Sequence, residues 1–105
     1  MKHIDLDIYV GQNAKENWTL IDNANKDDIW YHLQSLPSPH VVCNNEKKKY
    51  QCALLCKQYS KYKSFKNIKV IYTPINNLIK GSEIGSVYFK SKRKVDVINI
   101  RHDEY

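Results

Sequence analysis

Apolar and polar residues alternate with a period of two in residues 4–10 and again in residues 68–73. Successive side chains of a β-strand point to opposite faces, so this alternation predicts two half-buried strands, the first ending at Gly11 and the second at Pro74. Further strands are predicted at residues 29–33, 40–43, 86–90 and 95–100. The last of these is expected to be largely buried, since its apolar residues are Val95, Val97, Ile98 and Ile100.

The period changes to that of a helix between about residues 46 and 62. The positions that share its inner face, at i, i+3, i+4 and i+7, are Cys52, Leu55, Cys56 and Tyr59. Asn44 or Asn45 is in place to cap the first turn, where the helix dipole favours Glu46. We therefore predict an α+β domain with a mainly antiparallel sheet, packed by this one main helix, over residues 1–105 as a single domain.

Three connecting segments complete this picture. Residues 18–21 are compatible with a short strand or with the start of a helix, and residues 76–81 with a loop or a single helical turn. Pro37-Ser38-Pro39 predicts a turn, because proline fixes φ and has no N–H for a strand ladder. His32 and His40 are therefore expected on neighbouring strands of one hairpin.

The composition indicates a protein that works inside the cell. The 105 residues are 42% hydrophobic, and no run approaches the roughly 18 apolar residues of a membrane span. The first residues carry two acids and no apolar stretch, so we expect no signal peptide and no membrane association. Three cysteines, an odd number, favour a reducing compartment, and we expect a cytoplasmic location.

The cysteines also raise the question of a metal. Cys52 and Cys56 share a helix face and could be joined by His40, but the spacing lacks a recognisable fourth ligand. Free cysteine commonly acts as a small buried hydrophobe. We expect no bound metal and no cofactor.

The chain carries a net charge of +6, supplied almost entirely by lysine. A basic excess on so small a domain favours a polyanionic partner, most often nucleic acid. The alternative is lysine used for solubility in a chain rich in Asn, Ile and Lys.

Several short blocks, none specific alone, occur in an order that resembles the RNA-binding domain of the NFACT proteins (NFACT-R). The blocks are Gly11-Gln12-Asn13 with Asn17, Ala24, Asp28-Ile29-Trp30-Tyr31-His32, Pro37-Ser38-Pro39-His40-Val41-Val42, Tyr59-Ser60-Lys61, Val70-Ile71-Tyr72-Thr73 and Gly85-Ser86-Val87. The resemblance covers nearly the whole chain. The region around residues 67–78 looks like the short eukaryotic NFACT-R-only proteins, although we expect no coiled-coil extension here.

The resemblance implies a non-catalytic nucleic-acid-binding module that is related to the factors of ribosome-associated quality control and acts near the ribosome or tRNA. RNA is expected as its partner in preference to DNA, and the sequence does not name the target. Translation factors are possible protein partners. The family often has Gly-Arg-Asn where this chain has Gly11-Gln12-Asn13. Loss of that arginine removes a bidentate phosphate donor, which affects affinity more than fold.

The residue types suit such a function. Aromatic rings stack on bases, imidazoles and amides bond to phosphates or base edges, and lysines neutralise phosphates. Trp30 and Tyr31 point to opposite faces of their strand, so at most one of them joins the surface of His32. The candidate nucleic-acid-binding residues are Asn13, Lys15, Asn17, Trp30, His32, His40, Lys47, Lys48, Lys49, Lys61, Lys63, Lys92, Arg93 and Lys94.

Two other classes of function compete with this interpretation. A metal-dependent nuclease would need Asp28 beside the two histidines, but the chain has no convincing paired carboxylates, phosphate loop or nucleophile set. We therefore do not expect an enzyme. A protein-interaction module that docks on translation factors fits the composition equally well, and the salt dependence of binding would separate it from an RNA binder.

Overall fold

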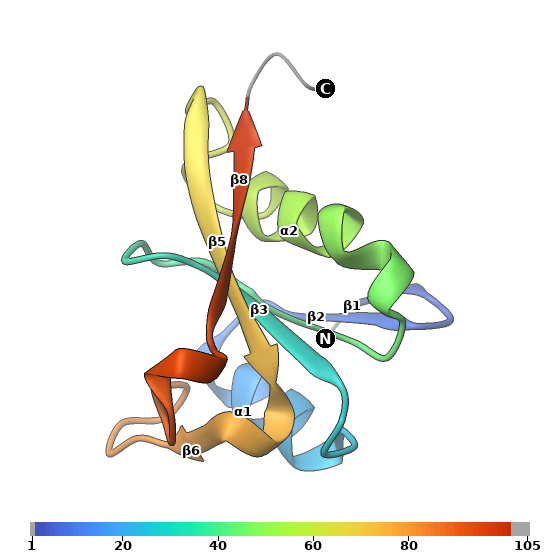
Figure 1. The fold of residues 1–105 in the computed structure, drawn as a ribbon, viewed down its shortest axis with the longest axis vertical. Helices are drawn as coiled ribbons and strands as arrows, with labels where there is room; N and C mark the ends of the chain where they lie inside the picture. The colour runs from blue at the N-terminus through green and yellow to red at the C-terminus, as the bar shows by residue number, and fades with distance from the viewer. Residues whose placement is uncertain (1, 102–105) are drawn as a thin grey trace.

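The computed structural model describes residues 2–101, and its main element is a six-stranded, wholly antiparallel sheet (Figure 1). In spatial order its strands are β1 (Lys2–Asp5), β2 (Ile8–Gly11), β4 (His40–Cys43), β3 (Ile29–Leu33), β5 (Asn67–Pro74) and β8 (Asp96–Arg101). A separate hairpin pairs β6 (Leu78–Lys80) with β7 (Val87–Phe89). The α-helices are α1 (Ala14–Asn23) and α2 (Lys49–Gln58), and the 3-10 helices are η1 (Glu46–Lys48), η2 (Ile75–Asn77) and η3 (Lys92–Lys94).

Both faces of the main sheet are covered, and each has its own core. Helix α2 packs on one face, where the buried side chains include Ile8, Val10, Tyr31, Leu33, Val41, Cys43, Cys52, Leu55 and Cys56. Helix α1 and the β6–β7 hairpin pack on the other face, around Leu20, Trp30, Val42, Ile75 and Leu78. The period of two therefore sends Tyr31 and Leu33 towards α2, and Trp30 and His32 towards α1.

The α+β class and the antiparallel sheet are confirmed, but the main helix is shorter than expected. Instead of residues 46–62, it comprises η1 followed by α2, which ends at Gln58. Asn45 caps the start, since its side chain accepts a hydrogen bond from the Lys47 N–H. Ser60 ends the helix because its hydroxyl bonds to the Lys57 carbonyl and accepts from the Tyr62 N–H, in competition with the helical bonds. Tyr59, expected on the inner face, is 39% exposed.

A second helix, α1, contains residues 18–21, for which the sequence pattern allowed either a short strand or the start of a helix. Asn13 accepts a hydrogen bond from the Glu16 N–H at 2.9 Å, and the Glu16 carboxylate accepts from the Gln12 N–H at 3.1 Å. The arrangement is a variant of the capping box, in which Glu16 bonds to the residue before the N-cap Asn13, and it stabilises the first helical turn. The expectation of one main helix was therefore incomplete.

Two strand predictions, and the prediction of a loop or helical turn at residues 76–81, differ from the structure. Residues 4–10 do not form one strand, because Leu6 and Asp7 turn the chain between β1 and β2, and the Asp5 carboxylate accepts from the Leu6 N–H at 2.6 Å. Strand β8 is not largely buried: it lies at the sheet edge and only Ile100 is fully covered. Residues 76–81 are divided between η2 and β6.

Candidate nucleic-acid interface

Four connections of the fold meet at one end of the main sheet and enclose a groove of about 490 Å³. They are the β2–α1, β3–β4 and β6–β7 connections and the segment that follows α2. His32 and His40, from the paired strands β3 and β4, also line the groove. We call this feature the histidine groove. Its polar side chains come from positions far apart in sequence, which only the fold brings together.

His40 is fixed beneath the groove by Trp30. The Trp30 indole Nε1–H donates to His40 Nδ1 at 2.9 Å, and the two rings meet edge to face. His40 is only 4% exposed. Burial, together with the neighbouring His32, lowers the pKa of His40 to about 3, so the ring is neutral at physiological pH. Because its Nδ1 accepts the indole hydrogen, the ring hydrogen of neutral His40 must be on Nε2.

His32 has the opposite tautomer. Its Nδ1 lies 2.6 Å from the Leu33 carbonyl oxygen, which accepts hydrogen bonds but cannot donate, so Nδ1 carries the hydrogen. Burial lowers the pKa of His32, although the bond to the Leu33 carbonyl acts in the opposite direction. The ring stacks on Trp30 at 5.6 Å and stands perpendicular to His40 at 5.1 Å between ring centroids. Neutral His32 therefore has its lone pair on Nε2.

The two histidines thus form a neutral pair with complementary ring nitrogens. His40 Nε2–H is a donor and His32 Nε2 is an acceptor. Within residues 2–101, neither of these two nitrogen atoms has a hydrogen-bond partner. The pair can bond to a ligand that presents an acceptor and a donor together.

Asn17 closes the inner wall of the groove from helix α1. Its side-chain oxygen accepts a long hydrogen bond of 3.4 Å from the His40 backbone N–H, and the residue is 8% exposed. Gly11 makes room for this side chain, because a Cβ at position 11 would lie 2.4 Å from the Asn17 oxygen. Gly85 approaches the same helix from the β6–β7 connection: its φ is +91° and a Cβ there would lie 2.8 Å from Ala14. Both glycines are therefore required by close packing.

The structure brings only some of the predicted site residues together. Asn13, Asn17, His32, His40 and Lys61 line the histidine groove. Lys15 and Lys63 are exposed, and each lies within two residues of a groove-lining residue in the sequence. Trp30 does not offer a ring face to a ligand, because it is 1% exposed and serves to hold His40.

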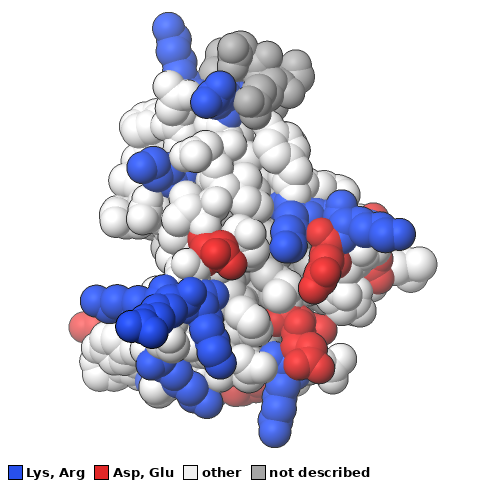
Figure 2. Space-filling view, viewed as in Figure 1, with Lys and Arg blue, Asp and Glu red and all other residues white. Residues whose placement is uncertain are grey.

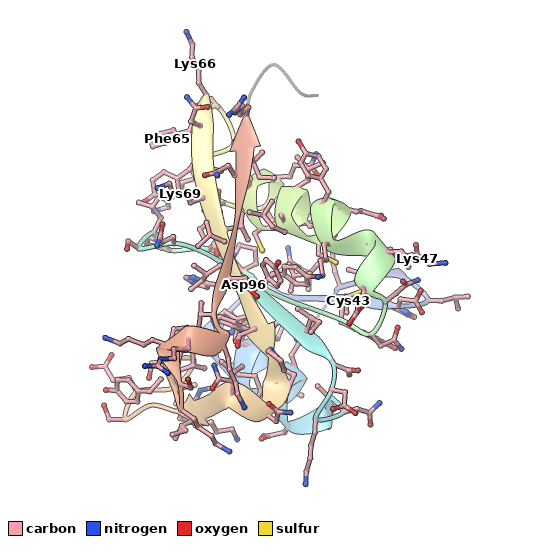
Figure 3. The ribbon with its side chains drawn as sticks, viewed as in Figure 1. Cys43, Lys47, Phe65, Lys66, Lys69 and Asp96 are labelled. Atoms are coloured by element: carbon pink, nitrogen blue, oxygen red, sulfur yellow. The ribbon has the colours of Figure 1, made fainter. Side chains whose placement is uncertain are left out.

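The run Lys47, Lys48 and Lys49 lies at the other end of α2 from Lys61. Ten helical residues separate the two places, which is about 15 Å along the axis. Lys48 is held by Asp5 and Asp7, at 2.9 Å from each, and hydrogen bonds from Lys48 lower the pKa of both carboxyl groups. In Figure 2, acidic side chains lie among the basic ones on this part of the surface, and Figure 3 shows Lys47 pointing outward from the start of the helix.

Lys92, Arg93 and Lys94 form a separate basic patch on η3, which Figure 2 shows together with other basic side chains near β6. Two further hollows share lining residues with the groove, with each other and with this patch. A second hollow, of about 270 Å³, shares His32, His40 and Gly85 with the groove. A third, of about 570 Å³, shares Ser35, Ile71 and Phe89 with the second and includes Lys92 in its lining.

The groove residues that were not among the predicted site residues are Gln12, Ala14, Pro37, Ser38, Pro39, Tyr59, Ser60, Ile84 and Gly85. All of them except Ala14 and Ile84 belong to one of the family-like blocks of the sequence, so membership of a block was the available signal. Ser38 also holds the β3–β4 connection in place, since its hydroxyl accepts from the Leu33 N–H at 3.0 Å.

The three cysteines lie on the other face of the sheet, buried beneath α2, as predicted for Cys52 and Cys56. Burial raises the pKa of both of these thiols, which disfavours the thiolate form that binds metals. No group of three or more His, Cys, Asp or Glu side chains suited to a metal occurs within residues 2–101. A metal-dependent nuclease would need Asp28 beside the histidines. Asp28 instead precedes the first residue of β3, away from His32, and its carboxylate accepts a hydrogen bond from the Asn25 N–H.

The sequence matches a model of the NFACT protein RNA binding domain over residues 2–91. The chain belongs to this family. It is 30% identical to mouse coiled-coil domain-containing protein 25 over 106 residues, covering 89% of this chain and 51% of the relative. It is 33% identical to the Rqc2 homolog RqcH of Bacillus subtilis over 99 residues, covering 88% of this chain and 17% of that protein.

The fold of this NFACT-R domain is also found in a solved structure, described as the C-terminal of the fibronectin/fibrinogen-binding protein from Streptococcus suis. The TM-score is 0.79 at 24% identity, over 90% of this chain and 40% of the other. The chain spans about half the length of the coiled-coil relatives and a smaller part of the other two proteins. In the described part of the chain, no helix is both long and apolar enough to cross a membrane.

Proposed function

We propose that this NFACT-R domain is a non-catalytic RNA-binding module whose targets are tRNA or ribosomal RNA. The observation that carries the proposal is the convergence of five family-like blocks on one groove, with an exposed lysine at its edge. The family match is to a domain described as RNA-binding, which agrees with the +6 charge of the chain. A role near the ribosome is supported by the relationship to the Rqc2 homolog RqcH.

In this proposal, attraction and positioning come from different residues. Lys15, Lys61 and Lys63 supply charge close to the groove without reading sequence, since lysine contacts to phosphate act on any nucleic acid. The histidine pair and the two asparagines fix how the chain of the RNA lies. The adjoining hollows provide a path along which a strand reaches the patch on η3, where Lys92, Arg93 and Lys94 meet further phosphates.

No catalytic step is proposed for the histidines. A general base needs a pKa near the working pH, and the pKa of His40 lies at about 3. The matching family model describes a binding domain and names no reaction. Both rings therefore act as fixed hydrogen-bonding groups.

The test is a fluorescence anisotropy titration of the purified domain against tRNA, a mixed RNA pool and DNA of the same length, at two salt concentrations. We expect binding to RNA that weakens as salt is raised, with a slope set by the number of phosphates engaged. Replacement of Lys61 and Lys63 by Gln should reduce that slope. A matched control, Lys66→Gln, changes an exposed lysine at the start of β5, which Figure 3 shows pointing away from the body of the domain.

Absence of RNA binding at low salt would overturn the proposal and favour docking on a protein partner. If Lys66→Gln reduces the salt dependence of RNA binding as much as the replacement of Lys61 and Lys63 does, the RNA is not bound at the groove.

A further inference from the structure

We infer that the histidine groove receives a single unpaired RNA base, with the attached phosphate remaining outside at the rim. This inference rests on the proposed function and specifies which part of the RNA the groove binds. It follows from the tautomers of the histidine pair, from the apolar walls of the groove and from the capping of helix α1.

The groove has the size and lining of a site for a small, flat, partly apolar group. Its volume of about 490 Å³ lies within the range of roughly 300–1,000 Å³ that is typical of small-molecule sites. Pro37, Pro39, Tyr59 and Ile84 contribute apolar surface, while Asn17 and the two histidines supply polar atoms. Such a mixture of a few polar atoms with apolar walls suits a base better than a phosphate group.

The polar atoms of the histidine pair are not those that a phosphate needs. Phosphate oxygens accept hydrogen bonds, so a site built for them presents donors and positive charge. Here the pair offers one donor, His40 Nε2–H, and one acceptor, the lone pair of His32 Nε2. Every RNA base carries both donors and acceptors on its edges, and bases become accessible where the strand is unpaired. The pair is therefore complementary to a base edge.

The start of helix α1 is also unsuited to a phosphate. A helix N-terminus often binds anions through its free N–H groups. In this chain Asn13 accepts from the Glu16 N–H, and the Glu16 carboxylate already accepts from the Gln12 N–H. These two bonds occupy N–H groups that an anion at the helix start would otherwise meet. Lys61, exposed at the edge of the groove, is the cation placed to meet the phosphate of the bound nucleotide.

The first experiment uses NMR spectroscopy of the domain labelled with nitrogen-15. The Trp30 indole N–H reports on the groove, because it is bonded to His40. The Trp18 indole N–H donates to the Ser86 carbonyl and serves as an internal comparison. We expect adenosine or cytidine to shift the Trp30 signal in a saturable way, and inorganic phosphate at the same ionic strength to leave it in place. Equal shifts with phosphate, or no shift with any nucleoside, would overturn the inference.

The second experiment compares three RNA probes by anisotropy: a single-stranded oligonucleotide, the same oligonucleotide with abasic residues, and a blunt duplex. The abasic probe keeps every phosphate and lacks the bases. We expect it to bind roughly five-fold to a hundred-fold more weakly than the intact strand, as is typical when a bound base is removed. This comparison uses the unaltered protein and does not depend on the folding of a variant.

The outcomes separate the inference from the proposed function. If the intact and abasic strands bind equally well, the base site is excluded although the domain still binds RNA. If none of the probes binds at low salt, the proposed function fails. His32→Ala should reduce the difference between the intact and abasic probes, whereas Lys61→Gln should weaken both to the same degree. A His32→Ala variant that preserves the difference would also count against the base site.

Discussion

The buried, neutral state of His40 predicts that the domain loses stability in mild acid. An unfolded imidazole titrates near pH 6.5, whereas burial lowers the pKa of His40 in the folded protein to about 3. Above pH 6.5 both states are neutral and the imidazole has no effect on the pH dependence of stability. As the pH falls below 6.5, the unfolded state binds a proton that the folded state excludes, and the loss of stability continues until about pH 3.

The size of the effect follows from the two pKa values. Each pH unit between them changes the free energy of unfolding by about 1.4 kcal/mol. Between pH 7.5 and pH 5.0 the contribution of His40 therefore amounts to about 2 kcal/mol, since only the 1.5 units below pH 6.5 count. His32, whose pKa is also lowered, acts in the same direction. The lowered pKa values of Asp5 and Asp7 take effect only at more acid pH.

The variant that tests this is His40→Asn, in which the side-chain oxygen can take the place of Nδ1 and accept from the Trp30 indole but cannot titrate in this range. We expect the variant to be less stable than the wild type at pH 7.5, because the smaller side chain leaves a cavity. Its further loss of stability down to pH 5.0 should be smaller than that of the wild type by about 2 kcal/mol.

The assay is urea unfolding at pH 7.5, 6.5, 5.5 and 5.0, followed by tryptophan fluorescence. His3→Asn, which changes an exposed imidazole on β1, is the matched control and should follow the wild-type curve. If the His40 and wild-type curves run parallel to within about 0.5 kcal/mol, the argument from burial is refuted.

Three further predictions concern packing and metal content. Gly11→Ala should destabilise the domain by about 1–3 kcal/mol in urea unfolding, because the new Cβ meets the Asn17 side chain; unchanged stability would show that this contact relaxes freely. Cys52→Phe should cost about the same, since the site beneath α2 is fully buried, whereas Gln51→Phe at an exposed position should cost little. Elemental analysis of the tag-free protein should find no stoichiometric zinc, as the ligand spacing predicts.

Strands β3 and β4 were predicted correctly although their burial does not alternate, since β4 is buried at all four positions. Strands β3 and β4 were located from their residue types, and the proline-rich turn between them placed His32 and His40 on neighbouring strands. The period of two also put Trp30 and His32 on the same face, as the structure confirms. Here the sequence pattern and the tertiary packing agree, so local reasoning was sufficient.

The sequence predictions are wrong or incomplete where the local pattern of apolar residues does not reflect the folded chain. Alternation runs unbroken through residues 4–10, although Leu6 points into solvent at 85% exposure and the chain reverses there. Helix α1 was left undecided because its inner face includes the polar Asn17, which weakens the apolar period. Its Asn13-x-x-Glu16 capping box was the overlooked signal.

The groove itself could not have been predicted from periodicity. Gln12 and Gly85 are separated by most of the chain, and they meet because Gly85 approaches Ala14 closely enough to exclude any side chain. The neutral state of the histidines depends on burial, which no count of charges along the sequence contains. What the sequence did supply was the set of family-like blocks, and the fold explains why they occur together.

The positions of the cations bear on how the domain would discriminate among polyanions. Lys48 is engaged by Asp5 and Asp7, and Lys80 by Asp22, so these two lysines are not free to meet phosphates. The remaining lysines attract any polyanion, because phosphate contacts carry no information about pairing or sequence, so discrimination has to come from the local contacts at the groove. A neutral donor and acceptor at the groove would favour unpaired RNA over a duplex of equal charge. Discrimination of this kind should therefore increase as salt is raised, since salt weakens the phosphate contacts but leaves the neutral hydrogen bonds largely intact.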